Sequence, residues 1–310
     1  MNILIPGQYP RSEKLVAATR DFDRRRITDE ELEAVRKEDA EDFMQKQTGF
    51  AYMSTGNLAW QDHLRPYADI ITGCKVTGLK RFFETNTFWK VLEPSSETPA
   101  VDESKLDEWV ERYFLAGGMY TPDSALVFTM PFLYLFKRYS RNIEYAQITE
   151  ILDTVARRLM TLPEKMLVIF EPSVGFTELT DEERKLGRDF LAKISTYSNT
   201  PVILATAFFD VTSELEFLYT LPVSGFGIDF YANPVEKILQ GFPMGKLLMT
   251  GAVATDSTHV EEADKLRDFF NSVTWHIDRS QVFASFAGPA ELLPREAADA
   301  KLDVLKEVMS

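Results

Sequence analysis

The stretch PVILATAFFDVTSELEFLYTLPVSGFGIDF, residues 201–230, decides the fold class. Its apolar run at 202–204 is typical of a fully buried strand, and residues 225–230 form a second such run after an amphipathic connector. Two buried strands joined by a helix predict a parallel βαβ unit.

Polar side chains follow both strands of this unit. Thr206 and Asp210 come after the first strand, and Asp229 and Tyr231 come at the end of the second. Because ligands of parallel α/β folds bind outside the carboxyl ends of the strands, these positions are the first candidates for a site. Asp210 has an alternative role as the cap of the short helix that follows it.

Buried strand candidates, each followed by helix, recur eight times, beginning at Asn2, Phe50, Ala125, Met166, Val202, Gly225, Lys246 and Gln281. Eight alternating βα units predict an α/β fold, a (β/α)8 TIM barrel with residues 1–310 in a single domain. We expect an N-terminal helical excursion at 12–47, opened in part by a capping box of Thr28 and Glu31, and an insertion near 77–99 beside the active face. Helices are also expected to begin near Trp60 and to cover 142–160.

Composition excludes several classes of protein. Asp and Glu number 48 against 34 Lys and Arg, a net charge of −14, which argues against nucleic acid as a partner because phosphate binding depends on basic groups. The only cysteine, Cys74, permits no internal disulfide and no Cys-rich zinc motif. No apolar run is long enough to span a membrane, so we expect a cytoplasmic protein.

Barrel geometry predicts where the site residues lie. Loops after the strands converge on one mouth, so we expect a polar cluster there formed by Arg11, Asn57, Asp62, His63, Asn86, Glu171, Asp210 and Asp229. Asp62 and His63 are neighbours on an expected helix and therefore cannot face each other as a triad pair does. Glu171 follows a buried strand, where desolvation raises the pKa of a carboxyl and a cation such as Arg11 would lower it; alternatively, it only anchors a loop through backbone N–H groups.

Seven segments resemble one family in order and spacing. They are Tyr9-Pro10-Arg11, STGNLAWQDH (54–63), RFFETNTF (81–88), Phe170-Glu171-Pro172, ATAFFD (205–210), the strand at 225–230 and ELLPREAADAKL (291–302). Together they resemble the N-terminal barrel of the cobalamin-independent methionine synthases. In that family a second, C-terminal barrel holds a zinc ion that activates homocysteine as a thiolate.

The resemblance implies a barrel without zinc. In its register the zinc ligands would fall on Ala205, Ala207, Asp229 and a position near Ala287-Gly288, which lack the required thiolates and imidazole. The family's N-terminal barrel helps to bind the polyglutamate tail of methyltetrahydrofolate, a role that would pass to Arg11 and Lys14. Asn57, Asn86, Asp210 and Tyr231 complete the expected donor-binding set, with no tightly bound cofactor.

Three functions follow as hypotheses. The first is the N-terminal-type half of a split methyltransferase from 5-methyltetrahydrofolate, or another methyl donor, to homocysteine, working with a separate catalytic barrel protein. The second is an independent enzyme of the wider barrel superfamily that includes uroporphyrinogen decarboxylase, using Asp62, His63, Glu171 and Asp229. The third is a noncatalytic homo-oligomer whose barrel mouth is filled by its own side chains, such as Phe208, Phe209 and Tyr231.

Overall fold

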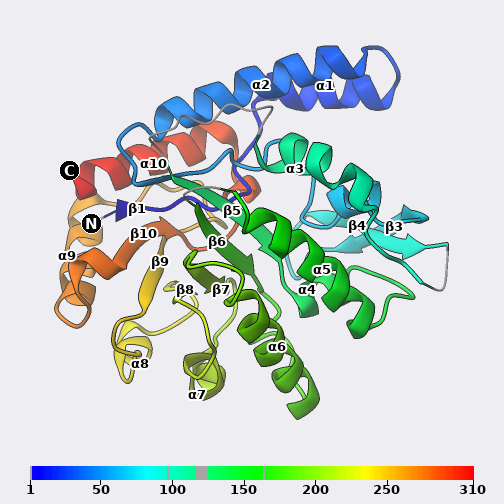
Figure 1. Ribbon diagram of the computed structural model, residues 1–310. Coiled ribbons are helices and arrows are strands. Elements are labelled where there is room, and N and C mark those ends of the chain that lie inside the picture. The colour runs from blue at the N-terminus through cyan, green and yellow to red at the C-terminus, as the bar shows by residue number, and fades with distance from the viewer. Residues whose placement is uncertain (1, 96–97, 116–124, 163–164) are drawn as a thin grey trace.

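The eight predicted strands form one parallel barrel sheet in the computed structural model (Figure 1), which describes residues 2–95, 98–115, 125–162 and 165–310. Its hydrogen-bonded order is β1-β10-β9-β8-β7-β6-β5-β2, so strands adjacent in the barrel sequence are adjacent in space. This confirms the (β/α)8 fold. The strands are β1 (Asn2–Ile3), β2 (Tyr52–Met53), β5 (Ala125–Pro131), β6 (Lys165–Phe170), β7 (Val202–Ala205), β8 (Gly225–Asp229), β9 (Leu247–Val253) and β10 (Val282–Phe286).

The two end strands of this order, β1 and β2, lie near each other and nearly close the barrel. The loops that follow them are joined by a hydrogen bond from the backbone N–H of Tyr9 to the carbonyl oxygen of Gly56, at 2.9 Å. Between these loops Gly7 packs so tightly that an added Cβ would lie 2.4 Å from Cγ of Asn57. Only glycine therefore fits at this position of the loop after β1.

Helices cover the outside of the barrel, as expected for alternating βα units. The expected helix at 142–160 is α5, and it is preceded by a short helix, α4, that the sequence analysis did not separate. The helices after β2 are α3 (Leu106–Phe114), α4 (Leu133–Arg138), α5 (Tyr145–Leu159), α6 (Asp181–Ile194), α7 (Leu215–Tyr219), α8 (Val235–Leu239), α9 (Ala263–Thr274) and α10 (Arg295–Met309). In the described part of the chain no helix is long and apolar enough to cross a bilayer.

Two antiparallel helices, α1 (Glu13–Asp23) and α2 (Asp29–Lys46), stand beside the barrel next to α10 (Figure 1). The capping box predicted for the second helix is present: the Thr28 hydroxyl accepts from the N–H of Glu31, and the Glu31 carboxylate accepts from the N–H of Thr28. Apolar side chains of both helices enter a core cluster shared with β1 and α10, which includes Leu15, Leu32, Phe43 and Leu302. This packing fixes the wall of the barrel mouth on the side of β1.

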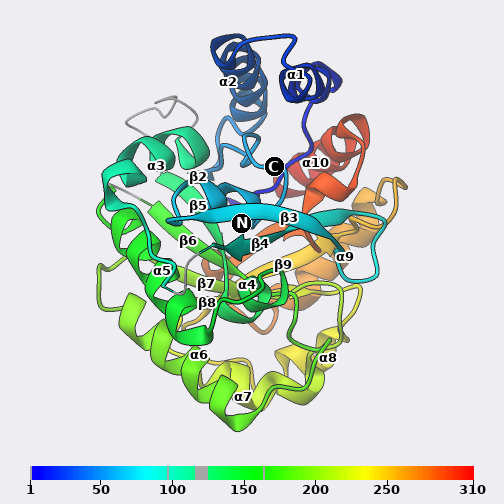
Figure 2. The same ribbon diagram turned by 90° about the vertical axis from the view of Figure 1, so that its right-hand side faces the viewer.

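An antiparallel hairpin of β3 (Cys74–Arg81) and β4 (Phe88–Pro94) lies across the carboxyl ends of the barrel strands (Figure 2). It occupies most of the range expected for an insertion, of which residues 96 and 97 lie outside the described part. Most of β3 is exposed, whereas Trp89, Val91 and Leu92 of β4 are buried against the barrel. The hairpin is therefore the roof of the mouth.

The prediction of a helix beginning near Trp60 is wrong. Residues 57–64 form turns, followed by a single 3-10 turn at Arg65–Asp69. The Asp62 carboxylate accepts hydrogen bonds from the N–H groups of Leu64 at 3.0 Å and Arg65 at 2.7 Å. Hydrogen bonds from a side chain to the backbone of the next residues compete with the hydrogen bonds of a helix. At Asp62 these side-chain bonds replace the helix.

Candidate functional site

A column of aromatic rings fills the centre of the barrel mouth beneath the hairpin. The His63 ring stacks on Phe170, at the end of β6, with 5.0 Å between ring centroids, and it lies 5.3 Å from Trp89 of the hairpin. Trp89 in turn stacks at 3.8 Å on Phe82, which meets Phe208 edge-on at 5.7 Å. The middle of the mouth is thus packed with side chains, and the open spaces lie at its rim.

The first open space, here called the hairpin cleft, has a volume of about 560 Å³. It is lined by the hairpin tip at 83–87, by Phe208 and Phe209 after β7, by Asp229, Tyr231 and Ala232 after β8, by 254–258 after β9, and by Ala287, Leu292 and Leu293 after β10. Three predicted site residues, Asn86, Asp229 and Tyr231, therefore line one cleft. Asn86 lies at the exposed tip, where its Oδ1 accepts from Arg81 at 3.5 Å.

Asp229 holds the loops of this cleft together. One carboxylate oxygen accepts from the N–H of Phe208 at 2.9 Å, and the other accepts from the N–H groups of Tyr231 at 2.8 Å and Ala232 at 3.2 Å. Burial raises the pKa of Asp229, and these hydrogen bonds counteract that rise. Phe208 has a left-handed backbone, φ 71°, which is rare for a bulky residue and is sustained by this anchor.

The second open space, here called the arginine cleft, has a volume of about 630 Å³. It is lined by Tyr9, Pro10 and Arg11 after β1, by Glu13, Val16, Ala17 and Arg20 of α1, by Trp60, by Glu291 and by residues 293–296. Leu293 lines both clefts, so they adjoin. Arg11 makes one long hydrogen bond, from its guanidinium to Oγ1 of Thr19 at 3.5 Å, and burial lowers its pKa.

Glu291 lies beside Arg11 in this cleft. With its amide nitrogen turned towards Glu291, Gln8 donates to the two carboxyl oxygens at 2.7 and 2.6 Å. Burial, assisted by the nearby Asp62 carboxylate, raises the pKa of Glu291 to about 8, and Arg11 acts against that rise. The Gln8 amide and the Arg11 guanidinium favour the charged carboxylate of Glu291, whereas burial favours the neutral acid.

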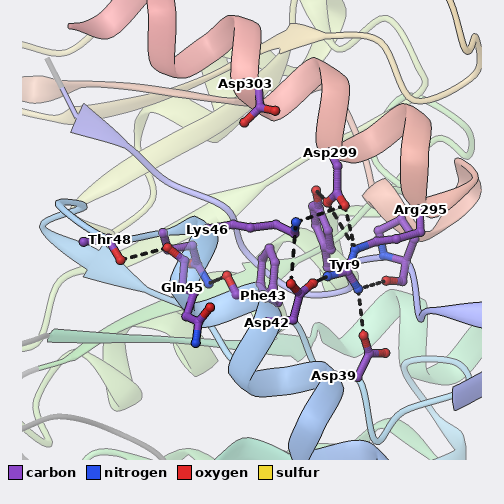
Figure 3. A network of polar contacts seen from close by, with 12 residues as sticks. Tyr9, Asp39, Asp42, Phe43, Gln45, Lys46, Thr48, Arg295, Asp299 and Asp303 are labelled. Carbon is purple, nitrogen blue, oxygen red and sulfur yellow. Dashed lines mark hydrogen bonds and ion pairs between the residues drawn. The ribbon is translucent and has the colours of Figure 1, made fainter. Parts of the chain in front are cut away.

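Arg295, by contrast, is fully engaged (Figure 3). Its guanidinium reaches Asp39 at 2.9 Å, Asp299 at 3.1 Å, the carbonyl oxygen of Pro10 at 3.1 Å and the carboxylate of Asp42. The Tyr9 hydroxyl donates to Asp299 at 2.7 Å, so one network ties the β1 loop, α2 and α10 together. Arg295 therefore builds the wall of the arginine cleft and has little capacity left for a ligand.

Asp62 and His63 lie under the hairpin, and no hydrogen bond joins their side chains in the described structure. The Asp62 carboxylate, besides its two backbone bonds described above, accepts from the N–H of Lys90 in β4 at 3.2 Å, which fastens the hairpin. Burial raises the pKa of Asp62. His63 is completely buried, both ring nitrogens lack a hydrogen-bond partner in the described part of the chain, and burial lowers its pKa to about 3.

Glu171 lies at the buried end of β6, as the sequence predicted, and caps a helix. One carboxylate oxygen accepts from the N–H of Leu135 in α4 and the other from the N–H of Ser173, both at 2.8 Å. Burial raises the pKa of Glu171 to about 7 while these bonds lower it, and Arg11 has no part in the shift. The geometry matches the alternative in which Glu171 anchors neighbouring backbone.

The remaining predicted residues are scattered. Lys14 lines neither cleft, and it pairs with Glu38 of α2 on the exposed surface. Asn57 is buried against Gly7, with its Nδ2 atom unpaired in the described structure. Asp210 accepts from the N–H of Thr212 at 2.8 Å, the capping alternative.

Sequence reasoning did not single out Arg20 or Glu84, which are free at the rim of the mouth. Arg20, Glu84 and Asp256 line the clefts, and none of their side chains makes a hydrogen bond or ion pair within the described part. Asp256 follows the predicted strand that begins at Lys246, so barrel topology predicts its place at the rim. Glu291 lay inside the ELLPREAADAKL segment that carried the resemblance, but its neighbours Gln8 and Arg11 are nearly the whole chain away and gave no local signal.

The positions expected for zinc ligands do converge on the mouth. Ala205 pairs with Gly227 two residues before Asp229, and an added Cβ on Gly288 would lie 2.9 Å from the Phe208 ring. In the described residues no group of three or more His, Cys, Asp or Glu side chains could hold a metal ion. The donor set present at these positions does not fit a zinc ion.

Comparisons with known proteins agree with the resemblance. Residues 71–274 match the family model for the cobalamin-independent synthase, N-terminal domain. The 5-methyltetrahydropteroyltriglutamate–homocysteine methyltransferase of Vibrio harveyi is 25% identical over 248 residues, 67% of this chain and 32% of that protein. The enzyme of the same name from Lactococcus lactis subsp. cremoris (strain MG1363) is 26% identical over 196 residues, 61% of this chain and 26% of that protein. The chain thus spans a third or less of these relatives.

Solved structures show the same fold. A B12-independent methionine synthase from Shewanella sp. W3-18-1, in complex with selenomethionine, superposes with a TM-score of 0.75 at 13% identity, covering 99% of this chain and 97% of that one. A putative vitamin-B12 independent methionine synthase from Listeria monocytogenes gives a TM-score of 0.71 at 12% identity, covering 98% and 95%. With the family model matching well over half of its length, the chain is related to methionine synthases and belongs to the family of cobalamin-independent synthase N-terminal domains.

Proposed function

We propose that this chain is the N-terminal-type half of a split methyltransferase, which binds the methyl donor and acts with a separate protein that carries the catalytic barrel. The observation that supports this most is the arginine cleft. In a chain of net charge −14, Arg11 and Arg20 line it without an ion pair among the described residues. A guanidinium without an ion-pair partner is suited to bind a carboxylate, often through two parallel hydrogen bonds.

The donor named for the Vibrio and Lactococcus relatives is a pteroyltriglutamate, whose tail carries several carboxylates. We propose that the arginine cleft binds this tail. Lys14 has a smaller part in this proposal than Arg11, because it lies outside the cleft and is paired with Glu38.

Thiol activation is assigned to the partner. Ala205 and Ala207 stand where a zinc site would need ligands, so we propose that the chain holds no zinc and that homocysteine is activated on the partner's barrel. The independent-enzyme hypothesis receives less support. Within the described structure no hydrogen bond or ion pair joins any two of its four residues, Asp62, His63, Glu171 and Asp229, and three of them are engaged by backbone N–H groups.

Calorimetric titration tests the donor half of the proposal. The chain is titrated with 5-methyltetrahydropteroyltriglutamate and with its monoglutamate, and we expect the triglutamate to bind more tightly. Arg11→Gln and Arg20→Gln should each weaken triglutamate binding by about 10-fold, the scale of one charged hydrogen bond. Arg24→Gln is the matched control, because Arg24 is exposed just after α1 and lies outside the cleft. Equal affinity for both donors, or no effect of Arg11→Gln, would contradict the assignment.

A reconstitution experiment tests the partner half. A catalytic methionine synthase barrel produced as a separate protein is assayed for methyl transfer to homocysteine with and without this chain. We expect transfer from the triglutamate donor to increase when the wild-type chain is present, and to increase less with Arg11→Gln. If the wild-type chain transfers the methyl group alone, the accessory role is wrong.

A further inference from the structure

Strand β3 leaves one edge of the hairpin open. The hairpin is a two-stranded sheet, and β3 lies on its side away from the barrel (Figures 1 and 2). In β4 the N–H of Leu92 donates to the carbonyl of Tyr139 at 3.0 Å, and its carbonyl accepts from the N–H of Arg141 at 2.8 Å, so neither group bonds to β3. Val76 lies opposite Leu92, and its own N–H and carbonyl therefore point to the open edge.

The same geometry recurs at Leu79. Lys90, the residue opposite it in β4, gives its N–H to the Asp62 carboxylate, so the backbone groups of Leu79 also face outward. No described residue forms a backbone hydrogen bond with this edge. Val76 and Leu79 thus present unpaired N–H donors and carbonyl acceptors, to which a further strand can bond.

The side chains of β3 present two different faces. Val76 and Leu79 share one face, because the residues opposite them in β4 are two positions apart, and they are 41% and 61% exposed. Lys75 and Lys80 share the other face, because the residues opposite them are four positions apart, and both are exposed. The open strand is therefore apolar on one face and basic on the other.

The surroundings of this edge are basic in a chain of net charge −14. The cations there, none of which makes an ion pair with a described residue, are Lys75, Lys80, Arg138 and Arg141. Burial lowers the pKa of Lys80, and the charges of Arg138 and Arg141 lower it further, so positive charge is concentrated at this place. Such a field attracts an acidic partner and repels a basic one.

We infer that β3 pairs with an extended, acidic segment of another polypeptide, which adds a third strand to the hairpin. Its backbone bonds to Val76 and Leu79, its carboxylates lie beside Lys75 and Lys80, and its apolar side chains lie on the opposite face. A second copy of β3 fits less well, because the lysines of the two strands would repel each other. No residue of β3 lines either cleft, so this surface is separate from the donor site.

A short fluorescein-labelled peptide of alternating Glu and Val tests the edge by fluorescence anisotropy. We expect the wild-type chain to bind it, and to bind the same peptide with Lys in place of Glu at least about 10-fold more weakly. N-methylation of every peptide bond removes the backbone donors of the probe and should weaken binding by a similar factor, with no change to the protein.

Variants of β3 test the same contacts from the other side. Val76→Pro removes the N–H at the open edge without removing a hydrogen bond to β4, and it should weaken peptide binding by about 10-fold. Val76→Ala keeps that N–H and is the matched control, which should lose less affinity than Val76→Pro. Lys75→Gln should weaken binding by about 3-fold, the scale of an exposed ion pair. Lys237→Gln, at an exposed lysine of α8, should leave it unchanged.

Several results would overturn the inference. They are no binding of the acidic peptide, equal binding of the acidic and basic peptides, and equal binding by Val76→Pro and the wild type. Heparin that displaces the peptide and binds Val76→Pro as tightly as the wild type would identify a surface for polyanions in general. Self-association of the wild type that Val76→Pro abolishes, measured by sedimentation, would make the partner a second copy of this chain instead.

Discussion

His63 gives the sharpest test of how this barrel mouth is built. The ring is completely buried between Phe170 and Trp89, neither nitrogen has a partner in the described structure, and burial lowers its pKa from 6.5 to about 3. Below pH 6.5 the His63 imidazole is therefore protonated in the unfolded chain but stays neutral in the folded chain until the pH approaches 3. Stability contributed by neutral His63 is present above that pH and is lost as the pH falls from 6.5 towards 3.

The size of the effect follows from proton linkage. Between pH 7 and pH 5 the unfolded imidazole becomes protonated while the folded one stays neutral, which lowers the free energy of unfolding by about 2 kcal/mol. His63→Phe keeps a flat ring in the stack and removes the titration. Any change in packing is the same at both pH values, so the variant's stability relative to wild type should rise by about 2 kcal/mol on going from pH 7 to pH 5.

Urea denaturation at pH 5, 6 and 7 measures this difference. His276→Gln is the control, because it replaces a histidine that lies exposed after α9, outside the barrel mouth. A stability difference between His63→Phe and wild type that is constant across the three pH values would refute the reasoning, because it would mean that folded His63 takes up its proton as easily as the unfolded chain does.

Four further outcomes are expected. Glu171→Ala should lower the free energy of unfolding by roughly 2–4 kcal/mol in urea, because the buried N–H groups of Leu135 and Ser173 lose their acceptor, and it should leave donor affinity unchanged. Arg138 lies 4.7 Å from the ring centroid of Phe83 at the hairpin tip, so Arg138→Ala should increase hydrogen exchange of the tip, and Arg138→Lys should restore part of the protection. Elemental analysis of the dialysed protein should find less than about 0.1 zinc per chain, whereas one tightly held zinc would show that the metal assignment is wrong. Binding of p-aminobenzoyl-triglutamate, the donor's tail without its pteridine ring, should take up protons at pH 8, because an anion near Glu291 (pKa about 8) raises that pKa further. Calorimetry in buffers of different ionisation enthalpy measures the uptake, and binding without proton uptake would place the tail elsewhere.

The barrel was predictable because each of its strands is a short apolar run that ends at a polar residue, Gly or Pro. The run 202–204, for example, is buried on both faces of β7, and no charged residue interrupts it. The hairpin was not predictable in the same way. Strand β3 is largely exposed and carries Lys75, Lys80 and Arg81, whereas the buried side chains of the hairpin belong to β4. Neither strand therefore shows a clear two-residue alternation over its whole length.

The position of the site was easier to predict than its chemistry. Topology alone places residues after parallel strands at one mouth, which is why Asp229 and Tyr231 line a cleft there. Whether a polar side chain there is free or already bonded depends on backbone N–H groups from distant segments, such as those of Phe208 for Asp229 and Leu135 for Glu171. A sequence shows the side chains in order, but it does not show which backbone donors fold against them.

Strongly shifted pKa values often mark functional sites, but in this barrel they belong to buried groups that stabilise the fold. His63, Asp62, Glu171 and Asp229 are shifted because they are buried, and the three carboxyls among them bond to backbone N–H groups that fix the hairpin, α4 and the loops after β7 and β8. A carboxylate that accepts hydrogen bonds from backbone N–H groups cannot also exchange a proton with a substrate without releasing the loop that it holds. The side chains left for a ligand lie at the rim: Arg11 and Arg20 line one cleft, and Glu84 and Asp256 line the other. Under the proposed function these side chains bind and orient the donor, and the partner's barrel supplies the groups that make and break bonds.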